Sequence, residues 1–214
     1  MTCKHCVKKT HVFFVLDTSG SMNSRRDDAI GAFNAQVDKL ISEQDSLGET
    51  DVTLILFGLM GPEMIKATQK VVPVGSISRL NHSTYVPQGS TPMRDAIGLA
   101  TAIGEQIDGK GEQEGFLVIT ITDGQENASK EWSPSALAAK INSLKETGRW
   151  TFQVLGTNID FNAVKDLGYE RTEFASYNNL QKSSGLLGDS LTKYAASRSL
   201  GRTATPGLSV PDSK

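Results

Sequence analysis

The stretch Val12-Phe13-Phe14-Val15-Leu16-Asp17-Thr18-Ser19-Gly20-Ser21 joins an apolar run to a polar segment of the form D-x-S-x-S. The apolar run has the length of a buried strand, so the polar segment is expected at the carboxyl end of that strand. One carboxylate and two hydroxyls within five residues are typical of a metal-binding loop. Asp and Ser are also ordinary turn residues, so the motif depends on what other segments supply.

Two further oxygen-bearing segments follow. Gly89-Ser90-Thr91-Pro92 opens a stretch of helical period, and Thr122-Asp123-Gly124 closes the apolar run 116–121. In an open α/β sheet, ligands bind outside the carboxyl ends of the strands. If the strands ending at Asp17 and Asp123 are neighbours, their carboxylates flank one crevice, which the Thr91 loop covers. The candidate metal ligands are therefore Asp17, Ser19, Ser21, Thr91 and Asp123.

The chemistry of these ligands predicts the kind of ion. Hydroxyl and carboxylate oxygens select hard cations, and a small cage with room for waters suits Mg²⁺, with Mn²⁺ or Ca²⁺ as substitutes. Thr91 also has an ordinary explanation, because a threonine before Pro92 is a suitable N-cap for the helix that begins there. The glycines beside the ligands are expected to be supports.

The rest of the chain alternates short apolar runs with segments of helical period, which is typical of βαβ units and a parallel sheet. The pattern predicts an α/β fold with an antiparallel strand at the edge. Strands are expected at 12–16, 51–57, 64–72 (the edge strand), 116–121, 150–155 and near 173–175. Helices are expected at 25–43, from 92 to about 109, at 134–147, around 161–167 and at 180–198.

Composition limits the class of protein. A chain of 214 residues with 38% hydrophobic content fits one large domain, and a net charge of −2 with scattered Lys and Arg favours neither nucleic acid nor an anionic membrane as partner. No apolar run has the length of a membrane span or of a signal peptide, so a cytoplasmic location is expected. The domain is expected over 11–200, between a segment 1–10 and a flexible tail 201–214.

The segment 1–10 contains Cys3-Lys4-His5-Cys6. This C-x-x-C motif is half of a zinc site, and His5 or His11 would add a third ligand. The alternative is a disordered, reduced N-terminus, which the small number of ligands favours.

At the five candidate ligands the chain resembles the von Willebrand factor A (vWA) domain family. The metal-ion-dependent adhesion site (MIDAS) of that family combines D-x-S-x-S with a Thr and an Asp from two later loops. The resemblance covers about residues 10–200. It implies a Rossmann-like, doubly wound, mostly parallel six-stranded sheet of order 3-2-1-4-5-6, with one antiparallel edge strand and helices on both faces. It also implies that Ser19, Ser21 and Thr91 bind the metal directly, while Asp17 and Asp123 act mostly through waters or hydrogen bonds.

The function implied by the resemblance is a metal-dependent protein-interaction module and not an enzyme. A dication held largely by neutral hydroxyls keeps an open coordination position, which an Asp or Glu of a protein partner fills. The chain looks most like small intracellular bacterial or phage members of the family, including those encoded near tellurium-resistance or AAA-ATPase genes. An AAA-ATPase or another neighbouring-gene product is therefore a candidate partner. The sequence does not specify the oligomeric state.

The alternative function is a Mg²⁺-dependent hydrolase or phosphotransferase on a similar sheet. Haloacid-dehalogenase-like enzymes also place an Asp, their nucleophile, at the end of the first strand. Those enzymes need a second acid two residues later, where this chain has Ser19. The three loops contain no Lys or His placed as acid or base, although His82 could approach.

Several residues are expected around the site. His82, Tyr85 and the turn at Met60 are candidates for its rim, and Arg25 and Arg26 for steering an acidic partner. Trp132 is expected to pack under the helix that follows it.

Overall fold

The computed structural model describes residues 9–109, 114–124, 126–156, 161–170, 173–176 and 180–199. The C-x-x-C segment and the tail 201–214 lie outside the described residues.

One sheet forms the centre of the molecule, in the order β3-β2-β1-β4-β5-β6. Its parallel members are β1 (Lys9–Asp17), β2 (Glu49–Phe57), β4 (Glu114–Thr122), β5 (Trp150–Gly156) and β6 (Phe174–Ser176), and β3 (Ile65–Pro73) runs antiparallel to β2. The predicted α/β class is confirmed, and so is a mixed sheet with the order 3-2-1-4-5.

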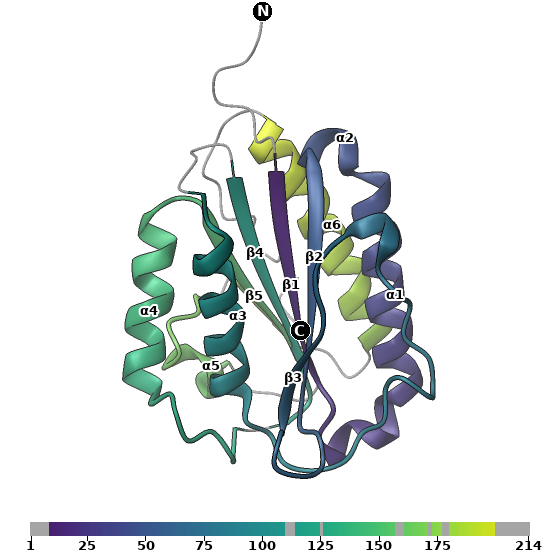
Figure 1. Cartoon of the computed structure of the whole chain (residues 1–214), viewed down its shortest axis with the longest axis vertical. Helices are drawn as coiled ribbons and strands as arrows, with labels where there is room; N and C mark the ends of the chain where they lie inside the picture. Colours follow the sequence, from purple (N-terminus) through teal and green to yellow (C-terminus); the bar gives the residue numbers. More distant parts are fainter. Residues whose placement is uncertain are drawn as a thin grey trace, which may run out of the picture.

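Helices cover both faces of the sheet (Figure 1). One face carries α1 (Arg26–Ser42), α2 (Gln44–Leu47) and α6 (Leu180–Ser199), and the other carries α3 (Met93–Ile107), α4 (Pro134–Glu146) and α5 (Asn162–Lys165). Two 3₁₀ turns, at Gly20–Arg25 and Val74–Ser76, precede α1 and follow β3. None of the described helices is long and apolar enough to cross a membrane.

The apolar runs are continuous because both faces of each central strand are buried. In β1, Phe14 and Leu16 pack on the side of α1 and α6, while Phe13 and Val15 pack on the side of α3 and α4. The strand begins three residues before the expected position, since Thr10 is also buried and its hydroxyl donates to the carbonyl of Leu47 at 2.7 Å. Such polar strand residues carry no apolar signal in the sequence.

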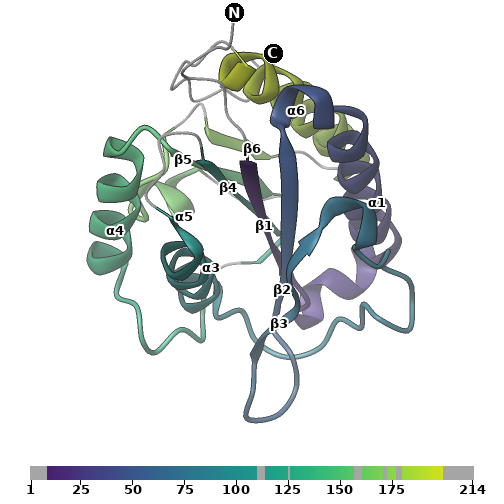
Figure 2. The same cartoon turned by 45° about the horizontal axis from the view of Figure 1, so that its top comes forward.

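The order of the strands determines where the loops meet. β1 pairs with β2 on one side and with β4 on the other. The strands that follow β1 are therefore added first on one side of it and then on the other, which makes β1 and β4 the switch point of the sheet. Asp17 is the last residue of β1, and β4 ends beside it at Thr122. The loops after β1 and β4 and the start of α3 consequently lie at one edge of the sheet, the lower edge in Figure 1. Figure 2 shows the β2–β3 hairpin projecting at this same end.

Candidate metal centre

Asp17 is the innermost polar residue of the centre, with no exposed surface. Its Oδ1 accepts a hydrogen bond from the backbone N–H of Ser19 at 2.7 Å, and its Oδ2 accepts one from the hydroxyl of Thr122. The Tyr85 hydroxyl donates to the Asp17 carbonyl oxygen at 2.5 Å. The carboxylate is thus fixed in one orientation by donors from two strands and their loops.

Burial raises the pKa of Asp17 to about 6, against the lowering effect of hydrogen bonds from Thr122 and Ser19 and with a smaller raising effect from the charge of Asp123. Two hydrogen bonds therefore do not offset the cost of placing this charge in the interior. A cation next to Asp17 would offset it. The electrostatics of the residue fit a metal centre.

The D-x-S-x-S loop is connected directly to the loop after β4. The Ser21 hydroxyl donates to Oδ1 of Asp123 at 2.7 Å, and the hydroxyl oxygens of Ser19 and Ser21 lie 3.1 Å apart. Ser19 is buried, Asp123 is half-buried and Ser21 is exposed. Their oxygens therefore extend from the interior to the solvent, which is the direction from which a partner would approach.

Thr91 is buried and faces the same position. A Cβ atom placed on Gly124 would lie 3.1 Å from the hydroxyl oxygen of Thr91 and 3.5 Å from Oδ2 of Asp17. The predicted role of Thr91 as an N-cap is wrong. Pro92 occupies the N-cap position of α3, and no side-chain hydrogen bond caps the helix there. The first-turn amide of Arg94 is instead bonded by Glu126 from the loop after β4, so the Thr91 hydroxyl is not needed there.

The backbones of the loops approach one another at two glycines with positive φ, Gly58 (94°) and Gly89 (96°). A Cβ atom on Gly58 would lie 2.6 Å from the backbone nitrogen of Ser19, and one on Gly89 would lie 2.6 Å from the carbonyl oxygen of Gly58. Gly20 also donates its N–H to the Gly89 carbonyl at 3.1 Å. Gly89 is among the glycines expected to be supports, whereas nothing in the sequence marks Gly58, which lies in the β2–β3 turn with no candidate ligand next to it in the chain.

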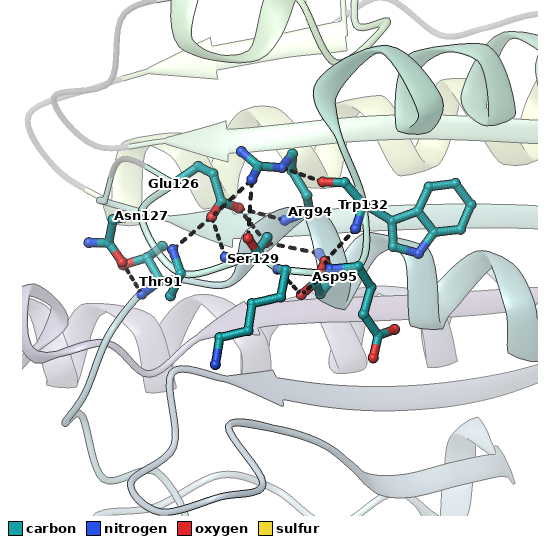
Figure 3. A network of polar contacts seen from close by, with 10 residues as sticks. Thr91, Arg94, Asp95, Glu126, Asn127, Ser129 and Trp132 are labelled. Atoms are coloured by element: carbon teal, nitrogen blue, oxygen red, sulfur yellow. Dashed lines mark hydrogen bonds and ion pairs between the residues drawn. The ribbon is translucent and has the colours of Figure 1, made fainter.

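Three more residues at the site were missed. Thr122 appeared in the sequence only as the neighbour of Asp123, yet its hydroxyl orients Asp17. Glu126 and Asn127 lie three and four residues after Asp123 and connect its loop to the start of α3 (Figure 3). Their closeness to Asp123 in the sequence could have marked them as part of the same loop. Their contacts could not be predicted from it, because these contacts join segments more than 30 residues apart.

Tyr85, expected at the rim, and Arg26, expected to steer an acidic partner, both bond to the backbone of neighbouring segments. Tyr85 is fully buried, because its hydroxyl reaches the backbone of Asp17, and burial raises its pKa. Arg26 donates to the carbonyl oxygens of Tyr85 and His82, so it connects α1 to this loop instead of facing a partner. His82 is exposed and its Nε2 lies 2.7 Å from Oδ1 of Asp27, which gives it a partner outside the three metal loops.

Trp132 contacts α3, the helix that precedes it in the chain. A Cβ atom on Gly98 of α3 would lie 2.2 Å from the Trp132 indole nitrogen, so this glycine makes room for the ring. The predicted start of α4 is confirmed, since the Ser133 hydroxyl accepts from the N–H of Ala136 and Pro134 occupies the first turn.

A hollow of about 270 Å³ lies beside the centre, between the β2–β3 turn and the segment after Asn127. Pro92, next to Thr91 in the chain, lines it together with Pro62 and Met64. Glu63, Lys130 and Glu131 are exposed at its edge. A polypeptide bound at the centre would have apolar surface within reach.

The donors at the centre select the type of ion. Among the residues that the structure describes, no group of three or more His, Cys, Asp and Glu side chains is arranged to hold a metal. The centre has only two carboxylates, Asp17 and Asp123, and its other side-chain donors are hydroxyls. Such a set fits a hard, oxygen-preferring cation better than one that needs thiolate or imidazole ligands. The assignment of the five residues as metal ligands stays a prediction.

No family model matches the chain. A curated relative, the uncharacterized protein YwmC of Bacillus subtilis (strain 168), is 29% identical over 128 residues, and the match covers 54% of this chain and 55% of the relative. The chain thus matches about half the length of that relative.

Solved structures share the fold over most of the chain. A von Willebrand factor type A structure from Catenulispora acidiphila has a TM-score of 0.57 at 16% identity, covering 90% of this chain and 43% of that one. The pilus adhesin SpaC from Lactobacillus rhamnosus GG has a TM-score of 0.63 at 17% identity, with 88% and 31% covered. Proximal thread matrix protein 1 from the mussel byssus, with a zinc-occupied MIDAS motif, has a TM-score of 0.57 at 13% identity, with 89% and 46% covered. The chain has the vWA fold, and it spans less than half of each of these three chains.

Proposed function

We propose that the chain is a vWA-family interaction module that holds Mg²⁺ at Asp17, Ser19, Ser21, Thr91 and Asp123 and through it binds an acidic residue of a protein partner. One observation carries the proposal. Hydroxyl and carboxylate oxygens from three separate loops converge at the carboxyl ends of the neighbouring strands β1 and β4, with Ser21 bonded to Asp123 at 2.7 Å. The type and order of these residues are those of a MIDAS.

The two carboxylates have a supporting role in this proposal. Asp17 holds the backbone of Ser19, and Asp123 accepts the hydrogen bond of Ser21, so each orients a hydroxyl-bearing residue. Oriented hydroxyls bring no charge of their own, so a bound dication keeps positive charge for a further anionic ligand. The ion would supply an open coordination position, and the partner's Asp or Glu would fill it. No part of the proposal requires catalysis.

The biological setting is proposed from the same resemblance. It is an intracellular bacterial or phage assembly, or a stress or defence system, with the partner supplied by a neighbouring gene such as an AAA-ATPase. The hollow beside Pro92 would contact the residues next to the partner's acid.

A random peptide library displayed on phage tests the function without a known partner. Phage are selected on the immobilised protein in Mg²⁺ and eluted with EDTA. We expect the eluted peptides to share an Asp or Glu, and we expect their binding to disappear when the acid is changed to Asn or Gln and when Thr91→Ala replaces the wild type. Selected peptides that lack an acid, or that bind Thr91→Ala as well as the wild type, would contradict the proposal.

A further inference from the structure

A network of hydrogen bonds joins the segment 126–132 to the start of α3, outside the five candidate ligands (Figure 3). Its acceptors are the side chains of Glu126, Asn127, Ser129 and Asp95, and most of its donors are backbone N–H groups. The network therefore fixes the course of the backbone on both sides. It connects the loop that carries Asp123 to the loop that carries Thr91.

Asn127 makes the contact closest to the centre. Its Oδ1 accepts from the backbone N–H of Thr91 at 2.8 Å, and its own N–H donates to the Thr91 carbonyl at 3.2 Å. Asn127 thus bonds both polar backbone groups of Thr91. Since Asn127 lies four residues after Asp123, the position of one candidate ligand depends directly on the loop of another.

Glu126 completes the connection from the same loop. Its Oε2 accepts from the first-turn amide of Arg94 at 2.8 Å, and its Oε1 accepts from the amides of Ala128 and Ser129 at 2.9 and 2.8 Å. A helix N-terminus has amides without intrahelical partners and favours negative charge. The Glu126 carboxylate supplies an acceptor for one of these amides and a negative charge, from a segment distant in the sequence. The Ser129 hydroxyl oxygen accepts from the next amide, that of Asp95, at 3.1 Å.

On the far side, Asp95 bonds the outer part of the segment. Its carboxylate accepts from the backbone N–H groups of Lys130 at 2.7 Å and of Trp132 at 2.9 Å. Glu126 thus bonds amides at the start of α3, and Asp95 of α3 bonds amides of the segment 130–132. We expect this reciprocal bonding to hold the spacing between the Thr91 and Asp123 loops.

We infer that Asn127, supported by Glu126, is a positioning residue that fixes the size of the metal centre and makes it select Mg²⁺ over Ca²⁺. The inference rests on the proposed function. Mg²⁺ requires short distances and near-octahedral geometry, whereas Ca²⁺ accepts longer distances and more variable geometry. A rigid pair of loops favours the smaller ion, and a flexible pair loses that preference.

The first test measures the connection in the metal-free protein. Amide hydrogen exchange at Thr91 is followed in wild type, in Asn127→Ala and in Asn127→Asp, all in EDTA. The Ala variant lacks the acceptor, so exchange at Thr91 should accelerate on the order of tenfold or more, while the Asp variant keeps an oxygen acceptor and should exchange at close to the wild-type rate. Equal protection of Thr91 in wild type and Asn127→Ala would overturn the inference.

The second test measures selectivity by calorimetric titration of Mg²⁺ and Ca²⁺ into the same proteins. Loss of a residue that orients a ligand typically costs about 10- to 100-fold in affinity, and we expect Asn127→Ala to lose Mg²⁺ affinity about tenfold while Ca²⁺ affinity changes little. Asn142→Ala, exposed on α4, is the matched control and should leave both affinities unchanged.

The two proposals fail in different ways. An unchanged ratio of Mg²⁺ to Ca²⁺ affinity in Asn127→Ala would overturn the positioning role and leave the metal-binding function in place. An equal loss of affinity for both ions is one such result, because a merely structural residue would have that effect. Absence of Mg²⁺ binding in the wild type would overturn both proposals.

Discussion

The two ends of strand β1 each bury a titratable side chain, His11 at the amino end and Asp17 at the carboxyl end. Asp17 is bonded by donors from Ser19 and Thr122. Neither ring nitrogen of His11 has a hydrogen-bond partner among the described residues. Its ring stacks instead on Phe116, with the ring centroids 5.1 Å apart.

The surroundings extend this difference. Near His11, Phe116 stacks on Trp150 at 4.4 Å, and Arg149 forms a two-pronged ion pair with Asp108 at 2.6 Å. Arg149 and Asp108 thus pair with each other, and the rings of His11, Phe116 and Trp150 form one stack. At the other end, oxygens of Ser21 and Asp123 reach toward solvent. The amino end of the sheet therefore contributes stability, and the carboxyl end carries the candidate function.

The largest expected effect is on metal affinity at the carboxyl end. Asp17→Ala removes the carboxylate that orients Ser19, and we expect the Mg²⁺ affinity to fall on the order of 100-fold. Competition with a fluorescent chelator measures it. Asp38→Ala, on the exposed surface of α1, is the control and should not change the affinity.

A substitution at the amino end of the sheet should lower the stability of the protein and leave its Mg²⁺ affinity unchanged. Arg149→Met removes both hydrogen bonds that the largely buried Asp108 accepts from the guanidinium, so the free energy of unfolding should fall by about 2 to 3 kcal/mol. Urea denaturation measures this loss, and Mg²⁺ affinity should stay at the wild-type value. A clear loss of Mg²⁺ affinity in this variant would mean that the two ends are not separate.

Gly58 tests how closely the loops must approach. Gly58→Ala combines an unfavourable positive φ with a Cβ atom 2.6 Å from the Ser19 nitrogen, and we expect it to destabilise the protein by about 2 kcal/mol and to weaken Mg²⁺ binding. Gly31→Ala on helix α1 is the matched control, because its Cβ atom would meet nothing within 4 Å. This change should stabilise the protein by about 0.5 to 1 kcal/mol. Equal effects of the two changes would contradict the close approach.

The smallest effect is a dependence of stability on pH at the amino end. Burial lowers the pKa of His11 from its ordinary value of 6.5, with smaller effects from the charges of Asp51, Lys9, Glu114 and Asp108. The unfolded chain therefore binds a proton below pH 6.5 more readily than the folded chain. The neutral His11 therefore contributes its full stability above pH 6.5, and this contribution is lost as the pH falls toward the lower pKa of the folded state. The free energy of unfolding changes by at most about 1.4 kcal/mol per pH unit from this one group.

The His11 variant isolates this contribution. His11→Phe keeps a ring to stack on Phe116 but cannot titrate. Denaturation curves between pH 5 and 7.5 should show a shallower dependence in the variant than in the wild type. Identical slopes would indicate that His11 does not contribute to the pH dependence.

The sequence predicted most of the fold because apolar runs such as 12–16 and 116–121 are buried on both faces and therefore continuous. It also identified candidate ligands in each of the three converging loops. What it missed are contacts between distant segments. Thr91 before Pro92 has the local pattern of an N-cap, yet Glu126, 35 positions later in the chain, supplies the bond to the first turn. Tyr85 lies in a stretch that is polar and irregular in sequence, so nothing local indicated that its ring is buried under Asp17.

The most direct test of the metal centre is calorimetric titration of Mg²⁺ into chelator-treated wild type and Thr91→Val, which keeps the shape of residue 91 and removes its hydroxyl. We predict one Mg²⁺ per wild-type chain, loss of that binding in the variant, and equal melting temperatures of the two proteins in EDTA. Absence of binding in the wild type, or equal binding by both proteins, would contradict this prediction.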